Sequence, residues 1–275
     1  MRTVLAAAAG LLLAGCAAPP DAARSPSQDM PPAAAVLSAA APTTGLSASA
    51  GGYWLVSATP EPTAVRAVDY RFQVLAPDGS AVTSFLGGDD SARVYAVRSD
   101  LTGLRRTVPA NLGEGVWSAR LGELDPGLWR IYVAFAPDGG PGSRLLLSRT
   151  LTVPGPGETS PLDPVSATAS VDGLTLRLGG RPVAGRPALL RLTVTRPAVQ
   201  LEPLDGGYAQ LTAVRDGDLA LAPFTPLTPA LAMAGGPTAE FRGRFPEPGA
   251  WRVFVQFRTE GQQHTATFTV RVRSR

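Results

Sequence analysis

The sequence contains two copies of one pattern, and this duplication limits the fold more than any other feature. The stretch DPGLWRIYVAF at 125–135 returns as EPGAWRVFVQF at 247–257. Three further pairs recur in the same order at nearly the same offset: 70–74 with 190–194, 96–101 with 213–219, and 151–153 with 268–270. Such repetition indicates a structural unit that is used twice. We place the copies at 45–153 and 165–275, with a Pro/Gly-rich linker at 154–164.

Hydrophobic residues alternate along the strands expected in each copy. In 129–135 the odd positions are Trp, Ile, Val and Phe, and we expect them to face a core. The even positions, Arg130, Tyr132 and Ala134, are expected to face solvent. Residues 251–257 repeat this pattern. Alternation with one solvated face is typical of strands in antiparallel sheets.

Turn sequences separate the expected strands. The tripeptide PDG occurs at 77–79 and again at 137–139, and the chain holds 30 glycines and 27 prolines in 275 residues. These residues favour tight turns and disfavour helical bundles. About seven short strands per copy predict an all-β protein of two tandem immunoglobulin-like antiparallel β-sandwiches. Trp129 and Trp251 are predicted to be core anchors at equivalent positions.

The composition excludes several classes of protein. Hydrophobic residues make up 44% and charged residues 17%, so a sizeable core can form. The single Cys excludes an internal disulfide, a Cys-rich zinc site and an iron–sulfur cluster. All 25 basic residues are arginines, and they are scattered along the chain. Nucleic-acid binding needs a basic patch or stripe, so we expect no nucleic-acid partner. We also expect no cofactor.

The N-terminus resembles the signal peptide of bacterial lipoproteins. A short basic start is followed by an apolar run at 4–13, which spans only about 15 Å as a helix and is too short to cross a bilayer. The run ends in Leu-Ala-Gly-Cys16, which is similar to a lipobox. The resemblance implies a signal peptide at 1–15 and a diacylglyceryl group on the Cys16 thiol. The alternative is an ordinary secretory peptide with an incidental cysteine. The Ala/Pro-rich stretch 16–44 is expected to be a disordered linker.

The two copies resemble tandem modules of uncharacterised secreted bacterial proteins of the YtkA-like and CopC-like kind. The resemblance rests on the Val-Arg segments, on the loops ending at Pro109 and Pro226, and on the Pro-Gly-x-Trp-Arg strands. In such relatives, histidines before and after the Val-Arg segment would suit copper or zinc. The matching positions here lack histidine; they are Arg93, Arg106 and Val108 in the first copy and Gln210, Pro223 and Thr225 in the second. Arginine stays protonated, and proline and valine offer no donor atom, so we expect no metal site there.

Few other residues suggest chemistry. His264 is the lone imidazole and the one weak candidate for a metal ligand, although a structural role is favoured. The sequence has no nucleophile elbow, P-loop or dinucleotide-binding motif. A carboxylate pair of the glycosidase kind stays open, because spacing in three dimensions is not visible in a sequence. We therefore expect no enzymatic activity.

Two functions remain at this point. The favoured one is a non-catalytic, lipid-anchored interaction module outside the cytoplasm, on the outer face of the cytoplasmic membrane or in the cell envelope. Its expected partners are the membrane, through the lipid on Cys16, and an envelope protein or polymer. The alternative is a protein that handles copper in the envelope and derives from histidine-bearing relatives. The choice of a binding role rests on analogy with the fold.

Overall fold

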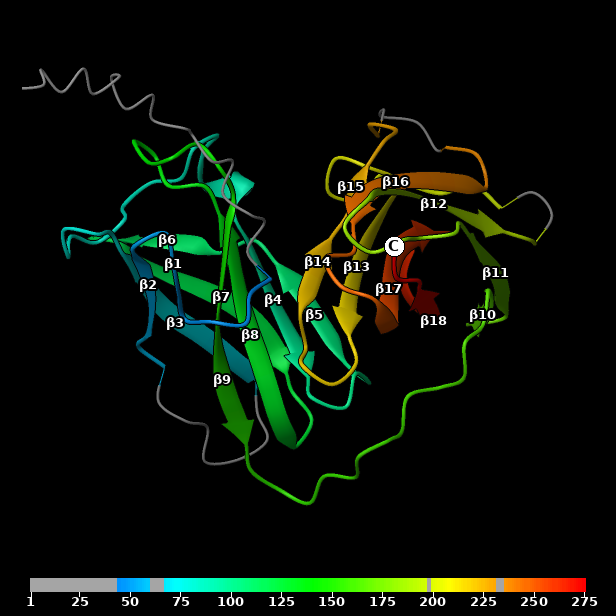
Figure 1. The fold of residues 1–275 in the computed structure, drawn as a ribbon, viewed down its shortest axis with the longest axis horizontal. Coiled ribbons are helices and arrows are strands. Elements are labelled where there is room, and N and C mark those ends of the chain that lie inside the picture. The colour runs from blue at the N-terminus through cyan, green and yellow to red at the C-terminus, as the bar shows by residue number, and fades with distance from the viewer. Residues whose placement is uncertain (1–43, 60–66, 197–198, 231–234) are drawn as a thin grey trace, which may run out of the picture. The chain divides into compact units, whose positions relative to one another are not determined.

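The computed structural model describes residues 44–59, 67–196, 199–230 and 235–275 (Figure 1). These residues belong to one compact unit, 40–275. The predicted signal peptide, Cys16 and all of the predicted linker 16–44 except Thr44 lie outside the described residues. In the described part, no helix is long and apolar enough to cross a membrane.

Each copy, hereafter called a repeat, folds into short strands. The described strands of the first repeat are β1 (Ser49–Ala50), β2 (Tyr53–Ser57), β3 (Ala67–Leu75), β4 (Arg93–Arg98), β5 (Leu104–Thr107), β6 (Ala110–Gly113), β7 (Val116–Glu123), β8 (Gly127–Phe135) and β9 (Leu145–Val153), with a 3-10 helix η1 (Asp89–Ser91) before β4. Those of the second repeat are β10 (Thr168–Val171), β11 (Leu174–Gly179), β12 (Pro187–Val194), β13 (Ala209–Arg215), β14 (Leu221–Pro223), β15 (Thr225–Pro226), β16 (Thr238–Arg244), β17 (Gly249–Thr259) and β18 (Gln262–Val272).

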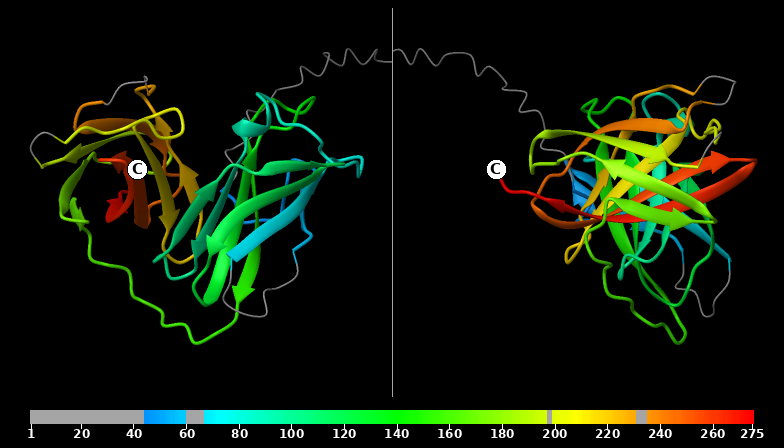
Figure 2. Two further views of the ribbon diagram at one scale, coloured as in Figure 1. Left: turned by 180° about the vertical axis from the view of Figure 1, so that it is seen from behind. Right: turned by 90° about the vertical axis from the view of Figure 1, so that its right-hand side faces the viewer.

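The strands of each repeat form two antiparallel sheets in the same order (Figures 1 and 2). In the first repeat the sheets are β1-β2-β3-β7-β6 and β5-β4-β8-β9, and in the second they are β10-β11-β12-β16-β15 and β14-β13-β17-β18. This is the order of an immunoglobulin domain, in which strands A, B, E and D form one sheet and C, F and G the other. The predicted fold class is confirmed. We call the four-stranded sheets that contain β8 and β17 the CFG sheets.

The two tryptophans predicted as core anchors occupy equivalent sites. Trp129 on β8 and Trp251 on β17 have no exposed surface. The indole Nε1 of Trp129 donates a hydrogen bond to the carbonyl of Asp125 at 2.8 Å, and that of Trp251 donates to the carbonyl of Glu247 at 3.1 Å. A buried indole needs a partner for its N–H, and both repeats supply it four residues upstream. The prediction is confirmed.

The second prediction for these strands, a solvated opposite face, is wrong. Tyr132 and Ala134 on β8 have no exposed surface, and Phe254 on β17 is only 1% exposed. Each CFG sheet therefore has two covered faces, one against its own sandwich and one against the other repeat. The second set of contacts forms what we call the inter-repeat cluster: Tyr95, Val97, Leu101, Leu104, Tyr132, Ala134 and Leu146 of the first repeat with Val214, Leu221 and Phe254 of the second.

Candidate functional site

The two repeats meet through the same strand positions. Three members of the inter-repeat cluster in the first repeat have their sequence equivalents in the second: Val97 with Val214, Leu104 with Leu221, and Tyr132 with Phe254. The contact is thus built like an isologous interface, in which one surface meets a copy of itself. Burial of large apolar and aromatic side chains is the main source of stability in such contacts.

Polar contacts join the repeats at the borders of this cluster. The phenol of Tyr132 donates a hydrogen bond to the carbonyl of Leu219 in the second repeat. Burial raises the pKa of Tyr132 above its ordinary range, so the phenol keeps the proton that it donates. The amide of Leu221 donates to the carbonyl of Thr44 at 3.0 Å, which places the start of the described chain at the same border.

The linker between the repeats is held at both ends by buried arginines. Arg98 on β4 donates to the carbonyl of Glu158 at 2.8 Å, and its guanidinium lies 2.5 Å from the Asp100 carboxylate. Arg252 on β17 pairs with Asp163 at 2.7 Å. Both arginines are less than a tenth exposed. The sequence indicated a Pro/Gly-rich connection, and the structure adds specific contacts that order it.

Five of the six positions that the predicted YtkA/CopC-like resemblance marked as lost ligand positions line one cleft of about 430 Å³. They are Arg93, Arg106, Gln210, Pro223 and Thr225; Val108 is not in the lining. The sequence placed these positions in two separate domains, and the structure brings both sets together because the CFG sheets face each other. The polar part of the lining also includes Arg144, Asp90, Ser91, Tyr95 and Asp205. We call this site the arginine cleft.

Arg106 is neutralised across the interface. It lies on β5 of the first repeat and forms an ion pair with Asp205 of the second. Its side chain is 9% exposed, whereas that of Asp205 is 41% exposed. Gln210 fixes the loop that carries the carboxylate, because its side-chain amide donates to the carbonyls of Leu204 and Asp205, both at 3.0 Å. Gln210 therefore has a structural role in the cleft.

Among the described residues, Arg93 has backbone carbonyls and no carboxylate as partners. Its Nη1 donates to the backbone carbonyls of Asp90 and Ala92. Its Nε is buried and has no hydrogen-bond partner among the described residues. Desolvation, and then the neighbouring charge of Arg106, lower the pKa of Arg93, while Asp205 opposes the shift. Arginine remains charged in proteins, so the cleft holds a half-buried cation whose hydrogen-bonding capacity is incompletely used.

Arg144 adds a third positive charge to the arginine cleft. It is exposed, and its Nη2 donates to the carbonyl of Ser91 at 3.1 Å. Arg144 forms no ion pair with a described residue, whereas Arg106 does. The lining holds Arg93, Arg106 and Arg144 against the carboxylates of Asp90 and Asp205, so positive charge is in excess.

His264 lies elsewhere and has a structural setting. Its Nδ1 is 2.7 Å from a carboxylate oxygen of Asp172, and its ring stacks on Phe257 with 5.2 Å between the centroids. In the part of the chain that the structure describes, no three His, Cys, Asp or Glu residues form a group that could hold a metal ion. The weak metal candidate of the sequence is thus engaged with one carboxylate.

Comparison with known proteins adds a family model and distant folds. The model, described as a domain of unknown function (DUF8832), matches residues 169–274, which is the second repeat. No curated protein matches the chain. A solved structure of a mutant Salmonella alpha-2-macroglobulin is similar at 15% identity and a TM-score of 0.26, over 85% of this chain and 15% of that one. The fibronectin(III)-like modules of Clostridium thermocellum CbhA are similar at 10% identity and a TM-score of 0.21, over 80% and 94%.

The chain spans only 15% of the length of the macroglobulin. The strand order of the present chain is enough to assign its class, which is a tandem immunoglobulin-like β-sandwich protein. The site that the fold builds is a cleft between repeats, lined by arginines.

Proposed function

We propose that the chain is a non-catalytic, lipid-anchored binding module of the bacterial cell envelope that docks an acidic partner in the arginine cleft. The supporting observation is that both repeats contribute residues to one cleft in which Arg93 keeps a buried guanidinium nitrogen that has no partner among the described residues. A buried polar atom without a partner costs free energy, and an incoming carboxylate would remove that cost.

The chemistry of the cleft selects the class of partner. Guanidinium groups bind carboxylates through paired, charge-assisted hydrogen bonds. The partner is therefore an envelope protein or polymer that presents carboxylates. We expect no nucleic-acid partner, because the arginines are scattered along the sequence and do not form a basic run.

The inter-repeat contact supports the choice of site. The CFG faces themselves are covered, because Tyr132 and Phe254 belong to the buried inter-repeat cluster. The cleft at the border of this contact remains accessible: Arg144 and Thr225 in its lining are exposed. The binding surface of the proposal is thus a composite of both repeats.

The membrane anchor is the second part of the proposal. Its support is the lipobox-like sequence before Cys16. Two or more acyl chains are needed for stable anchoring, and lipoprotein processing supplies them. The described chain begins at Thr44, which contacts Leu221 at the inter-repeat border. A spacer from 17 to 43 spans at most about 90 Å when extended, enough to hold the module clear of the membrane.

The anchor is tested by fractionation. Cys16→Ser is expected to release the protein from the membrane fraction or to leave it uncleaved, and to abolish labelling by a palmitate analogue. Equal labelling of the variant and the natural chain would refute lipidation at Cys16.

The binding site is tested with an acidic polymer. The full-length protein in nanodiscs is expected to bind poly-glutamate and not poly-lysine, with an affinity that falls as salt rises. Arg93→Gln should weaken this binding at least fivefold. Arg120→Gln removes the same charge from an exposed side chain outside the cleft and serves as the control. Equal loss in both variants would show that net charge, and not the cleft, attracts the polymer.

The alternative, copper handling in the envelope, is supported by one observation. Five positions matched to ligand positions of the relatives do converge in space. Their present side chains are Arg, Gln, Pro and Thr, which are not copper ligands of the usual kind. Binding of an acidic partner is therefore the function that we favour.

A further inference from the structure

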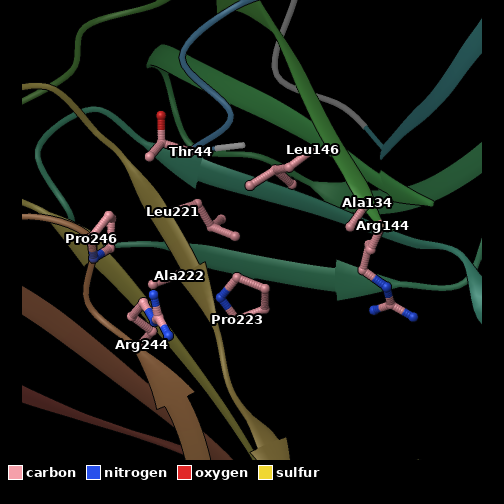
Figure 3. A pocket seen from close by; sticks show the side chains of 9 residues that line it. All are labelled: Thr44, Ala134, Arg144, Leu146, Leu221, Ala222, Pro223, Arg244 and Pro246. Atoms are coloured by element: carbon pink, nitrogen blue, oxygen red, sulfur yellow. The ribbon is translucent and has the colours of Figure 1, made fainter. Parts of the chain in front are cut away.

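A second cavity of about 190 Å³ opens between the repeats, and its walls are mostly apolar (Figure 3). Ala134 and Leu146 come from β8 and β9 of the first repeat, and Leu221 and Pro223 come from β14 of the second. We call it the apolar pocket. It shares Arg144 and Pro223 with the arginine cleft, so the two cavities are neighbours.

The charges at the apolar pocket all have one sign. Its lining includes Arg144 and Arg244, and it contains no acidic side chain. In the view of Figure 3 the two arginines lie on either side of Pro223. Both are exposed, and neither is in an ion pair with a described residue. The pocket thus combines an apolar interior with two cations that form no ion pair in the described part of the chain.

We infer that the apolar pocket binds a short amphipathic anion, an alkyl chain that carries a carboxylate or a phosphate. The alkyl chain would contact Leu146, Leu221 and Ala134, and the anionic group would lie at Arg144 and Arg244. The volume limits the size of the chain. One water-sized group takes about 30 Å³ in a liquid, so the pocket accommodates about six carbon or oxygen atoms.

The chemistry excludes related ligands. An alkylammonium ion would bring a third positive charge beside the two arginines. A neutral alcohol would fill the apolar space but would leave the guanidinium groups without an anion. Selectivity for the anion over both is therefore the signature of the site. This inference does not depend on docking of an acidic partner in the arginine cleft, because Arg244 and Leu146 line only the apolar pocket.

The test uses the full-length protein in zwitterionic nanodiscs, with empty nanodiscs as the blank, and titrates hexanoate, hexyl phosphate, hexanol and hexylammonium. We expect hexanoate or hexyl phosphate to bind with a Kd of about 1 mM or tighter, which is reasonable for ligands of about eight and about eleven heavy atoms. Hexanol and hexylammonium should bind at least tenfold more weakly. The ratio between hexanoate and hexyl phosphate identifies the preferred anionic group.

Two variants locate the binding. Arg244→Gln changes an exposed side chain and should weaken binding of the anion at least fivefold. Arg242→Gln removes the same charge from an exposed position on the same strand that does not line the pocket, and it should change the Kd less than twofold. Ala134→Leu should fill the pocket and abolish binding, provided that its circular dichroism and Tm show a folded protein.

Several results would overturn the inference. The first is equal binding of hexanol and hexanoate, and the second is an equal effect of Arg244→Gln and Arg242→Gln. The third is binding that appears only after removal of residues 17–43, because the chain would then cover its own pocket. The docking proposal is tested separately, by the binding of poly-glutamate to the natural chain and to Arg93→Gln. If poly-glutamate does not bind but hexanoate does, the docking proposal fails and the inference about the apolar pocket stands.

Discussion

Arg106 of the first repeat and Asp205 of the second form an ion pair across the contact between the two sandwiches. The arginine is 9% exposed and the carboxylate 41%. The exposure of the pair is therefore intermediate. Exposed ion pairs contribute little to stability, whereas disruption of a buried pair leaves an uncompensated charge. The pair also places a carboxylate beside the two neighbouring cations, Arg93 and Arg106.

Removing this carboxylate should destabilise the protein. Asp205→Asn leaves Arg93 and Arg106 in mutual repulsion, and we expect a loss of about 1–2 kcal/mol in the free energy of unfolding. Urea denaturation measures it. Glu260→Gln breaks an exposed pair with Arg196 and should cost less than about 0.5 kcal/mol. If both variants lose the same amount, the inter-repeat pair has no special role.

A charge placed in the inter-repeat cluster should uncouple the repeats. Phe254 points away from the core of its own sandwich, so Phe254→Asp should leave that core intact while it separates the CFG faces. We expect two unfolding transitions in place of one and faster proteolysis of the linker 154–164. Leu189→Asp alters an exposed residue of the second repeat and is the control. A single unchanged transition in Phe254→Asp would argue against the contact.

The two core tryptophans should be of equal importance. Trp129→Ala and Trp251→Ala each remove a fully buried ring and the hydrogen bond of its indole N–H. We expect each to lower the free energy of unfolding by about 3–5 kcal/mol. Trp54, which is 56% exposed, provides the comparison, and its replacement by Ala should cost less than about 1 kcal/mol. A small effect at either core position would contradict the equivalence of the two sites.

Asp100 should contribute a stability that acid removes. Burial alone would raise the pKa of Asp100, but hydrogen bonds from Thr102 and the Ser160 amide, with the charge of Arg98, lower it below the ordinary value. A group with a lowered pKa in the folded state stabilises the protein above its unfolded pKa of about 4 and loses that effect as the pH falls through the folded value. The stability difference between the natural chain and Asp100→Asn should therefore be full at pH 6 and shrink below about pH 4. Urea midpoints across this range measure it; a constant difference would exclude the linkage.

Metal binding should be weak. His264 has one carboxylate neighbour, Asp172, and the positions matched to the ligands of the relatives carry no donor set for copper or zinc. We expect chelator-treated protein to bind Cu²⁺ or Zn²⁺ no tighter than about 10 μM in calorimetry. A stoichiometric site that is tighter, and that His264→Ala abolishes, would favour the copper-handling alternative.

Arg93 and Arg106 of the arginine cleft have different kinds of partner. Arg106 pairs with the carboxylate of Asp205. Arg93 differs, because it is half-buried and bonded to backbone carbonyls.

The sequence by itself determined the duplication, the all-β class and the residues that share a face of each strand. Period-two alternation requires Trp129 and Trp251 to lie on the same side as their apolar neighbours, and both are buried as predicted. The same periodicity placed Tyr132 and Phe254 together on the opposite face. It could not reveal what covers that face, since period two records the geometry of one strand and not its surroundings.

Only the tertiary structure decided that the two opposite faces cover each other. Tyr132 and Phe254 are separated by more than a hundred residues in the chain, and the structure places both in one buried cluster. The same packing brings Arg93 and Gln210 into one cleft, although each was visible in the sequence only as a member of its own repeat. Local pattern fixes which side a residue faces, whereas the site forms from surfaces that meet only after both sandwiches have folded.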